Sequence, residues 1–282
     1  MPLFPRSDAT AVATVHPVRR IMPFLMPTKN GAFVLFEQQV PIAAARTFLA
    51  TLNAGRAPER AVTLFHLVLR AIGCALAEFP RLNRFVAGSR LYERRGIWLA
   101  FSGKQRMERD APLFTAKMLF DPNEPLEGMV ERLAALVGEG RSGETATDRE
   151  IKAFLRLPAP ILRAGVRVVR RLDAWGLLPP SFSKGDPLYA SAFVANLGSV
   201  GLDAAYHHLY EYGTIPIFVT MGRPHRAPVV LPDGSVTSRE VVALRYTYDE
   251  RVEDGFYAAG ALERLQALLE HPEALATGRA DG

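Results

Sequence analysis

Apolar residues along the 282-residue chain form two kinds of pattern: short runs rich in Phe, Val and Ile, and longer stretches at helical spacing. The short runs predict strands at 32–40, 84–93, 96–102, 113–120, 188–195, 214–221 and 236–248. The longer stretches predict helices at 42–52, 61–79, 124–137 and 256–269. Strands and helices mix without strict alternation. The pattern therefore predicts an α/β fold of the α+β kind, a mixed β-sheet flanked by helices, and not a doubly wound parallel sheet.

Turn residues and prolines mark two expected hairpins and the breaks between elements. A hairpin is expected around Arg94-Arg95-Gly96, and another around Pro232-Asp233-Gly234. The main domain is expected at 19–275, between an N-terminal arm at 1–18 and a tail at 276–282. Within it, residues from about 140 to 185 are expected to form a helical insertion, which begins in a glycine-rich loop and is broken by prolines.

Charge and cysteine content exclude several classes of protein. The net charge of +5 is concentrated at 149–184, where eight Lys or Arg face two acids, and no nucleic-acid-reading motif accompanies it. The single cysteine, Cys74, excludes an internal disulfide framework and is expected to lie in the core. Arg70 and Glu78 interrupt the most apolar run, so no membrane span is expected. Residues 1–20 lack the design of a secretory signal, which makes the cytoplasm the expected compartment.

Three segments carry a more specific signal. They read AIGCALAEFPRLN at 71–83, FVANLGSVG at 193–201 and YDERVEDGFYAA at 248–259. In order and spacing they resemble the acyltransferase core of 2-oxo-acid dehydrogenase complexes and its relative chloramphenicol acetyltransferase. The family forms of the last two are FTISNLG-x-x-G and x-DHRVIDGA-x-AA. The resemblance runs from about residue 19 to the last helix. No lipoyl domain or linker is seen, so a stand-alone core is expected.

The resemblance implies a chemistry for particular residues. In the family, the histidine of the last motif takes a proton from a thiol as general base. A serine on the NLG strand hydrogen-bonds the oxyanion, and the motif aspartate pairs with an arginine near the N-terminus. Here the histidine position holds Glu250 and the serine position holds Ala195. The supporting aspartate is Asp254, and the turn residues are Asn196 and Gly198. The arginine partner is expected to be Arg19 or Arg20.

Glu250 has two interpretations. An unperturbed glutamate has a pKa of about 4.3 and is a weak base toward a thiol, so burial between subunits would have to raise that pKa. Otherwise the side chain simply forms an ion pair with an arginine such as Arg251 or Arg245. For the missing serine, Ser199 or a backbone N–H is a candidate donor.

Two histidines are auxiliary candidates. His207 or His208 would supply a relocated base, although adjacent residues face different ways and at most one would serve. The plainer interpretation, that both pack at a subunit contact, is favoured. No His or carboxylate partner lies at metal spacing, so no metal is expected.

The basic segment also has several interpretations. Its apolar residues fall on one helical side and its arginines largely on another; they are Ile161, Val168, Leu172 and Trp175, and Arg163, Arg167, Arg170 and Arg171. A membrane-surface helix or a helix for an acidic partner fits this pattern. The arginines, with Lys184 and Gly198, are also candidates to hold the acyl donor that the resemblance implies, coenzyme A or acyl-CoA. An ordinary surface helix that packs its apolar side on the domain is slightly favoured.

The expected function is therefore transfer of an acyl group from CoA to an unidentified acceptor, with an altered active site. The alternative is a catalytically inactive homologue that acts as an oligomeric scaffold or ligand-binding protein. A third, weaker hypothesis is a hydrolase in which Glu250 activates water. The resemblance also implies a homotrimer or a multiple of trimers, because the family builds its active site at the junction of two subunits.

Overall fold

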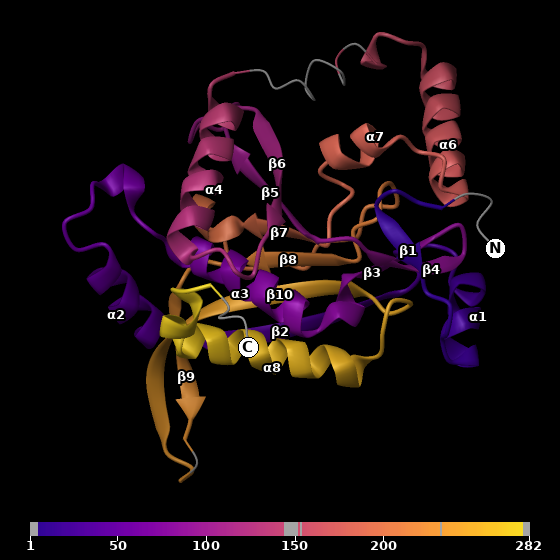
Figure 1. Cartoon of the computed structure of the whole chain (residues 1–282). Helices are drawn as coiled ribbons and strands as arrows, with labels where there is room; N and C mark the ends of the chain where they lie inside the picture. Colours follow the sequence, from indigo (N-terminus) through magenta and orange to yellow (C-terminus); the bar gives the residue numbers. More distant parts are fainter. Residues whose placement is uncertain (1–4, 144–151, 153, 232, 279–282) are drawn as a thin grey trace.

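A seven-stranded mixed sheet forms the centre of the computed structural model, which describes residues 5–143, 152, 154–231 and 233–278 (Figure 1). The strand order is β2-β10-β8-β7-β5-β6, and β9 pairs with the part of β10 that extends beyond the sheet. The strands are β2 (Phe33–Pro41), β5 (Ile97–Lys104), β6 (Leu113–Phe120), β7 (Ala192–Asn196), β8 (Ile217–Met221), β9 (His225–Val230) and β10 (Val236–Asp249). Only β5–β7 and β7–β8 are parallel pairs. The expected mixed sheet is confirmed.

A second, three-stranded sheet corrects one expectation. It consists of β1 (Ala9–Ala11), β4 (Arg90–Arg94) and β3 (Arg84–Ala87). The predicted strand at 84–93 is in fact the β3–β4 hairpin, which turns at Gly88 and Ser89. Both turn residues have positive φ, a conformation that suits a tight hairpin turn. The prediction that 84–93 pairs with 96–102 is therefore wrong, because β4 pairs with β1 and β3 while β5 joins the main sheet.

Two long helices cover one face of the main sheet. Helix α3 (Leu64–Glu78) and helix α8 (Gly255–Glu270) pack against each other and share the large apolar core with the sheet (Figure 1). Among the described residues, the stretch Pro58–Glu78 is the one helical segment long and apolar enough to cross a membrane, and more than half of it is buried inside the fold. Buried Arg70 on this helix donates to backbone carbonyls of Asp121, Pro122 and Thr277.

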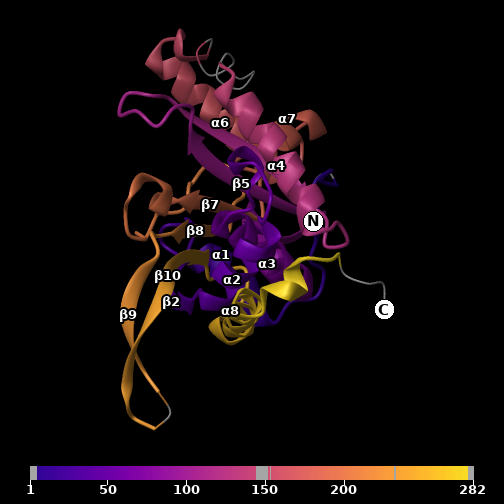
Figure 2. The same ribbon diagram turned by 90° about the vertical axis from the view of Figure 1, so that its left-hand side faces the viewer.

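The remaining helices of the described residues include one that packs on β6 and adds Met129 and Leu133 to the core. They are α1 (Pro17–Leu25), α2 (Ala43–Leu52), α4 (Leu126–Arg141), α6 (Ala159–Trp175) and α7 (Pro180–Gly185). The predicted insertion from about 140 to 185 contains α6 and α7, and part of its predicted loop lies outside the described residues. Figure 2 shows the β9–β10 hairpin projecting away from the body. Val230 and Val236 form a pair on this hairpin, and both are exposed.

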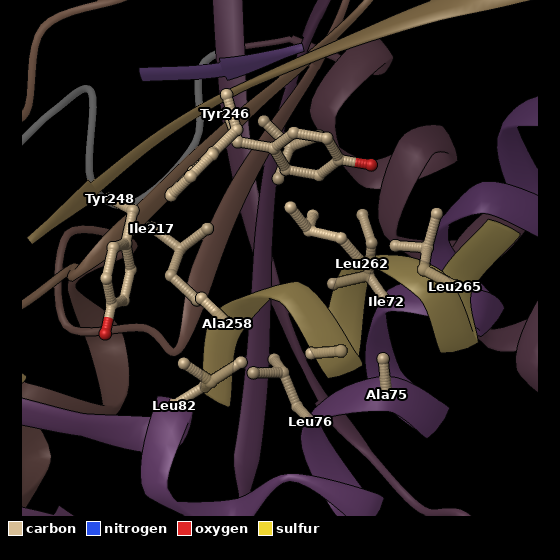
Figure 3. A pocket seen from close by; sticks show the side chains of 13 residues that line it. Ile72, Ala75, Leu76, Leu82, Ile217, Tyr246, Tyr248, Ala258, Leu262 and Leu265 are labelled. Carbon is tan, nitrogen blue, oxygen red and sulfur yellow. The ribbon is translucent and has the colours of Figure 1, made fainter. Parts of the chain in front are cut away.

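An apolar cavity of about 60 Å³ lies between α3, α8 and the sheet. Figure 3 shows side chains from both helices and from the sheet, including Tyr246 and Tyr248, pointing into it. The Tyr248 hydroxyl donates to the carbonyl oxygen of Glu253 at 2.6 Å. The cavity wall therefore supports the turn that follows β10.

The N-terminus of α3 makes stability sensitive to acid. His66 Nδ1 accepts a hydrogen bond from the backbone N–H of Thr63, and burial lowers the pKa of His66 to about 4. Between pH 6.5 and about 4 the unfolded chain binds a proton that the folded chain does not, so stability falls as the pH falls. We expect a loss of about 3 kcal/mol over this range.

Urea unfolding at neutral pH and at pH 4.5 measures this loss. His66→Gln is the matched variant, because glutamine keeps the reciprocal cap and does not titrate. The variant should lose less stability than wild type over the same range. Equal losses in the two proteins would contradict the assignment.

Candidate functional site

A tight turn after β10 holds the residues of the last motif. Asp249 and Arg251 form a buried two-pronged ion pair, with 2.8 Å from Arg251 Nε to Oδ1 and 2.7 Å from Nη2 to Oδ2. The backbone N–H of Arg251 also donates to Asp249 Oδ1. Arg251 Nη1 donates to the carbonyl of Met26, just after α1. This pair spans residue 250 and fixes the backbone on both sides of it.

Glu250 lies at the tip of this turn with its backbone held and its side chain exposed. Its N–H donates to Ala32 O at 2.9 Å, and its carbonyl oxygen accepts from Arg19 Nη1 at 2.5 Å. The ion pair considered above is not formed: Arg251 pairs with Asp249, and Arg245 pairs with Glu37. Within the described part of the chain, the Glu250 carboxylate has no ion-pair partner.

Asp254 begins helix α8 and is close to Arg19. Its side chain caps the helix by accepting from the N–H of Tyr257 at 2.9 Å, and Arg19 Nη2 lies 3.8 Å from Asp254 Oδ2. That backbone hydrogen bond, helped by Arg19 and Arg81, lowers the pKa of Asp254. Of the two candidate arginines, Arg19 therefore occupies the partner position, whereas Arg20 is exposed to solvent.

Glu253 is a site residue that the sequence reasoning missed. Its carboxylate is buried and lies 3.4–3.8 Å from nitrogens of Arg19, Arg81 and Arg84. Its Oε1 also accepts from the N–H of Asp254. The sequence did contain evidence for this residue, because the family motif has isoleucine at the position that Glu253 occupies in this chain. Through these arginines, the buried Glu253 carboxylate links α1, the turn at residues 80–83 (PRLN) and the start of α8.

A surface cavity of about 300 Å³ opens beside this turn. Asp254, Arg81 and Glu263 contribute charged groups, and Phe256 and Tyr257 contribute aromatic rings. The Arg81 guanidinium lies 3.9 Å from the centre of the Tyr257 ring, a cation–π contact. Phe256 is 91% exposed, which is unusual for a large apolar side chain.

The NLG turn follows β7 and is fixed by local contacts. Asn196 Oδ1 accepts from the N–H of Ser199, and the Ser199 hydroxyl donates to Asn196 O at 2.7 Å. Gly198 is required by close packing, since a Cβ there would lie 2.6 Å from Gly222 O. The hydroxyl hydrogen of Ser199 is therefore already donated to a hydrogen bond within the turn.

Ala195 lies between two hydroxyl-bearing residues of neighbouring strands. It is in register with Ser102 on β5 and with Thr220 on β8. Residues in register share one face of a sheet, about 4.8 Å apart. The Thr220 hydroxyl donates to Ala205 O at 2.6 Å, whereas half-buried Ser102 makes no such bond within the described residues. Of the two hydroxyls in register with Ala195, that of Ser102 is thus the one without a hydrogen bond among the described residues, and the sequence reasoning missed it.

The two histidines lie on the face of the sheet away from α3 and α8. The His207 ring stacks on Phe218 at 3.9 Å and on His208 at 4.4 Å. His207 Nδ1 lies 2.7 Å from His208 O. Because a carbonyl oxygen only accepts, Nδ1 carries the proton and Nε2 keeps a lone pair. Partial burial lowers the pKa of His207, which favours the neutral ring, while His208 is exposed.

The two ends of the candidate site lie far apart in one chain. Ala195 is level with Thr220 and Arg245 across β7, β8 and β10. Glu250 lies five residues beyond Arg245, which is roughly 17 Å along the strand. One chain therefore does not bring Glu250 together with Ala195 and Asn196.

Three other groups of residues from the sequence analysis belong neither to the Glu250 turn nor to the NLG turn. Lys184 is exposed on α7, and Cys74 is partly buried against the core. The arginines of α6 are exposed. Over the residues that the structure describes, no group of three or more His, Cys, Asp or Glu is placed to hold a metal ion.

Comparison with known proteins agrees with this architecture. Residues 188–277 match the family model of the 2-oxoacid dehydrogenases acyltransferase (catalytic domain). The lipoamide acyltransferase component of the branched-chain alpha-keto acid dehydrogenase complex of Bacillus subtilis (strain 168) is 21% identical over 209 residues, covering 74% of this chain and 39% of that protein. The chain thus spans about two fifths of the length of this relative.

Solved structures share the fold over nearly the whole chain. A probable dihydrolipoamide acetyltransferase from Listeria monocytogenes 4b F2365 has a TM-score of 0.61 at 16% identity, covering 97% of this chain and 98% of that one. The cubic core of a pyruvate dehydrogenase multienzyme complex gives 0.60 at 17%, covering 94% and 93%. Chloramphenicol acetyltransferase gives 0.55 at 12%, covering 93% and 99%. The chain has the chloramphenicol acetyltransferase-like fold and is related to the 2-oxoacid dehydrogenase acyltransferases.

Proposed function

We propose that this protein transfers an acyl group from coenzyme A to a small acceptor, with Glu250 in the role of general base. The observation that carries the proposal is the contrast at Glu250, whose backbone is fixed by Ala32 and Arg19 while its carboxylate is exposed and unpaired within the described chain. A merely structural glutamate at this position would be expected to form a closed ion pair. A group poised for proton transfer needs a fixed position and a free carboxylate.

Each end of the site offers one support for the reaction. The cavity beside Asp254 offers the Arg81 guanidinium and aromatic rings, groups that suit an anionic ligand with a planar base. Ser102 is proposed to supply the hydroxyl that Ala195 lacks. Lys184 and Gly198 stay weaker candidates for contacts to the donor. No metal is invoked, and the cytoplasm stays the expected compartment.

A complete site is proposed to form between copies of the chain, in a trimer or a multiple of trimers. The roughly 17 Å that separates Glu250 from the level of Ala195 requires the NLG end of a second copy. A second copy would also exclude water from the surroundings of Glu250, as a closed active site does.

The outer face of α1 supports self-association. Val18, Ile21, Phe24 and Leu25 are all at least half exposed, on the helix whose Arg19 holds Glu250. Ile21→Asp with Phe24→Asp is expected to convert an assembly to single chains, because the change puts charges into an apolar contact. Light scattering measures the mass. Leu113→Asp, on the edge strand β6 of the main sheet, is the control and should keep the wild-type mass. An unchanged mass in the α1 variant would contradict this interface.

His207 is a second candidate for the base, favoured by its neutral ring and free Nε2. His207→Gln and Glu250→Gln separate the two, since the variant that abolishes turnover identifies the base. The proposed function itself is tested by release of free CoA from acyl-CoAs of several lengths, with thiol and amine acceptors. Acceptor-dependent release supports transfer, whereas release without any acceptor indicates a hydrolase. Saturable CoA binding without release indicates an inactive homologue.

A further inference from the structure

We infer that helix α6 binds the surface of an anionic membrane and so attaches the protein to a lipid bilayer. The inference rests on α6 alone and does not depend on the proposed acyl transfer. Figure 1 shows α6 at the margin of the molecule, away from the main sheet. The helix carries exposed apolar residues along one line and exposed arginines that have no ion-pair partner among the described residues.

The first feature is an exposed apolar strip. Ile161, Val168 and Trp175 follow one another at intervals of seven residues, so they lie along one line of the helix. They are 52%, 55% and 44% exposed. Leu155 and Leu157, just before α6, are also exposed. In the described residues of α6, only Asp173 is buried. The favoured expectation, that the apolar side packs on the domain, is therefore wrong for these three residues, whereas Leu172 on the same side is half-buried.

The second feature is a set of arginines that extends from beside the strip to the opposite side of α6. Arg163, Arg167, Arg170 and Arg171 are exposed, and none has an ion-pair partner within the described chain. At 100° per residue, Arg171 and Arg167 are the members nearest the line of Ile161, Val168 and Trp175. Positive charge and large apolar side chains therefore adjoin on one exposed surface.

The single acid of α6 does not neutralise this surface. Asp173 is turned inward, where Arg6 Nη2 donates to its Oδ1 at 2.8 Å and Arg6 Nη1 donates to its carbonyl. Arg6 is itself buried and also pairs with Asp8. This buried cluster fixes the C-terminal end of α6 to the N-terminal arm. The outward surface thus carries only positive charge, complementary to anionic headgroups.

A membrane fits these observations better than another protein. A helix with arginines on one side and a strip of large apolar residues ending in tryptophan has the composition of an interfacial helix. A second copy docking through the same strip would bring two rows of arginines together, which is unfavourable. An acidic partner protein would neutralise the arginines but would not explain why the apolar strip is exposed.

The full-length Trp98→Phe protein tests the inference, because it leaves Trp175 as the only tryptophan. With phosphatidylcholine vesicles that contain phosphatidylglycerol, Trp175 emission should shift to the blue and the protein should float with the vesicles. Vesicles of phosphatidylcholine alone should bind far less. Arg167→Ala with Arg171→Ala is expected to lower the partition coefficient roughly 30-fold, since each basic residue near the surface contributes about fivefold.

Two further variants keep the test decisive. Arg109→Ala with Arg239→Ala removes the same charge from exposed sites elsewhere and should bind as wild type does. Val168→Ser removes apolar area with no change in charge and should weaken binding. No binding to anionic vesicles, equal binding to neutral vesicles, or an α6 arginine variant indistinguishable from the control would overturn the inference. Binding of the protein to an acidic protein, without binding to vesicles, would also overturn the inference.

Discussion

Glu250→Gln is expected to lower kcat for CoA release by a factor of about 10² or more, with little change in KM, because the amide keeps the shape of the side chain but accepts no proton. The substitution tests the proposed base at the residue whose carboxylate is exposed and unpaired within the described chain. Steady-state release of free CoA, quantified by chromatographic separation of CoA from acyl-CoA, measures both constants.

The fold of this variant should be intact, since the carboxylate makes no ion pair in the described structure. Its thermal unfolding temperature is therefore the control. Glu250→His places the family's residue in the same fixed turn, and it should retain or gain turnover if the frame is competent. Full activity in Glu250→Gln would exclude a carboxylate base and direct attention to His207.

Asp249→Ala is expected to lower the free energy of unfolding by about 3–5 kcal/mol, because it leaves a buried guanidinium without its partner. Asp249 and Arg251 are 1% and 3% exposed in their side chains, and two short hydrogen bonds join them. Lys29 is buried nearby, and burial lowers its pKa to about 8. The loss of Asp249 removes the attraction that favours the charge on Lys29. Urea unfolding measures the change.

Two substitutions calibrate this result. Asp249→Asn keeps the shape and part of the hydrogen bonding and should cost less than the alanine. Glu37→Ala removes a carboxylate from the half-exposed pair with Arg245, and exposed pairs contribute only about 0–1 kcal/mol. Equal losses for Asp249→Ala and Glu37→Ala would show that burial gives the Asp249–Arg251 pair no special role.

The sequence was sufficient for most of the fold because the core elements have clear periodicity and clear ends. The helix predicted at 61–79 is α3, and the strand predicted at 113–120 is β6 with the same bounds. It failed at 84–93, where a run of strand-forming residues concealed a two-residue turn at Gly88 and Ser89. Periodicity describes which residues favour a strand, but the pairing of that strand depends on distant partners such as β1.

For the candidate site too, the sequence predicted some residues and missed others. The family resemblance placed Glu250 and Asp254 in one motif and left Arg19 or Arg20 as the partner, and the structure joins Arg19 to both motif residues. It did not find Ser102, whose relation to Ala195 depends on the register of two strands far apart in sequence. The separation of Glu250 from the NLG end is likewise a property of strand direction, and no linear motif encodes it.

The fixed turn around Glu250 is proposed to catalyse acyl transfer from CoA. The most direct measurement is acceptor-dependent release of free CoA by the wild-type chain, run beside Glu250→Gln at the same concentration with acetyl-CoA and longer acyl-CoAs. We expect release that needs an acceptor and falls by a factor of about 10² or more in the variant. Saturable CoA binding with no release by wild type would contradict it and would identify a fold that kept its ligand and lost its chemistry.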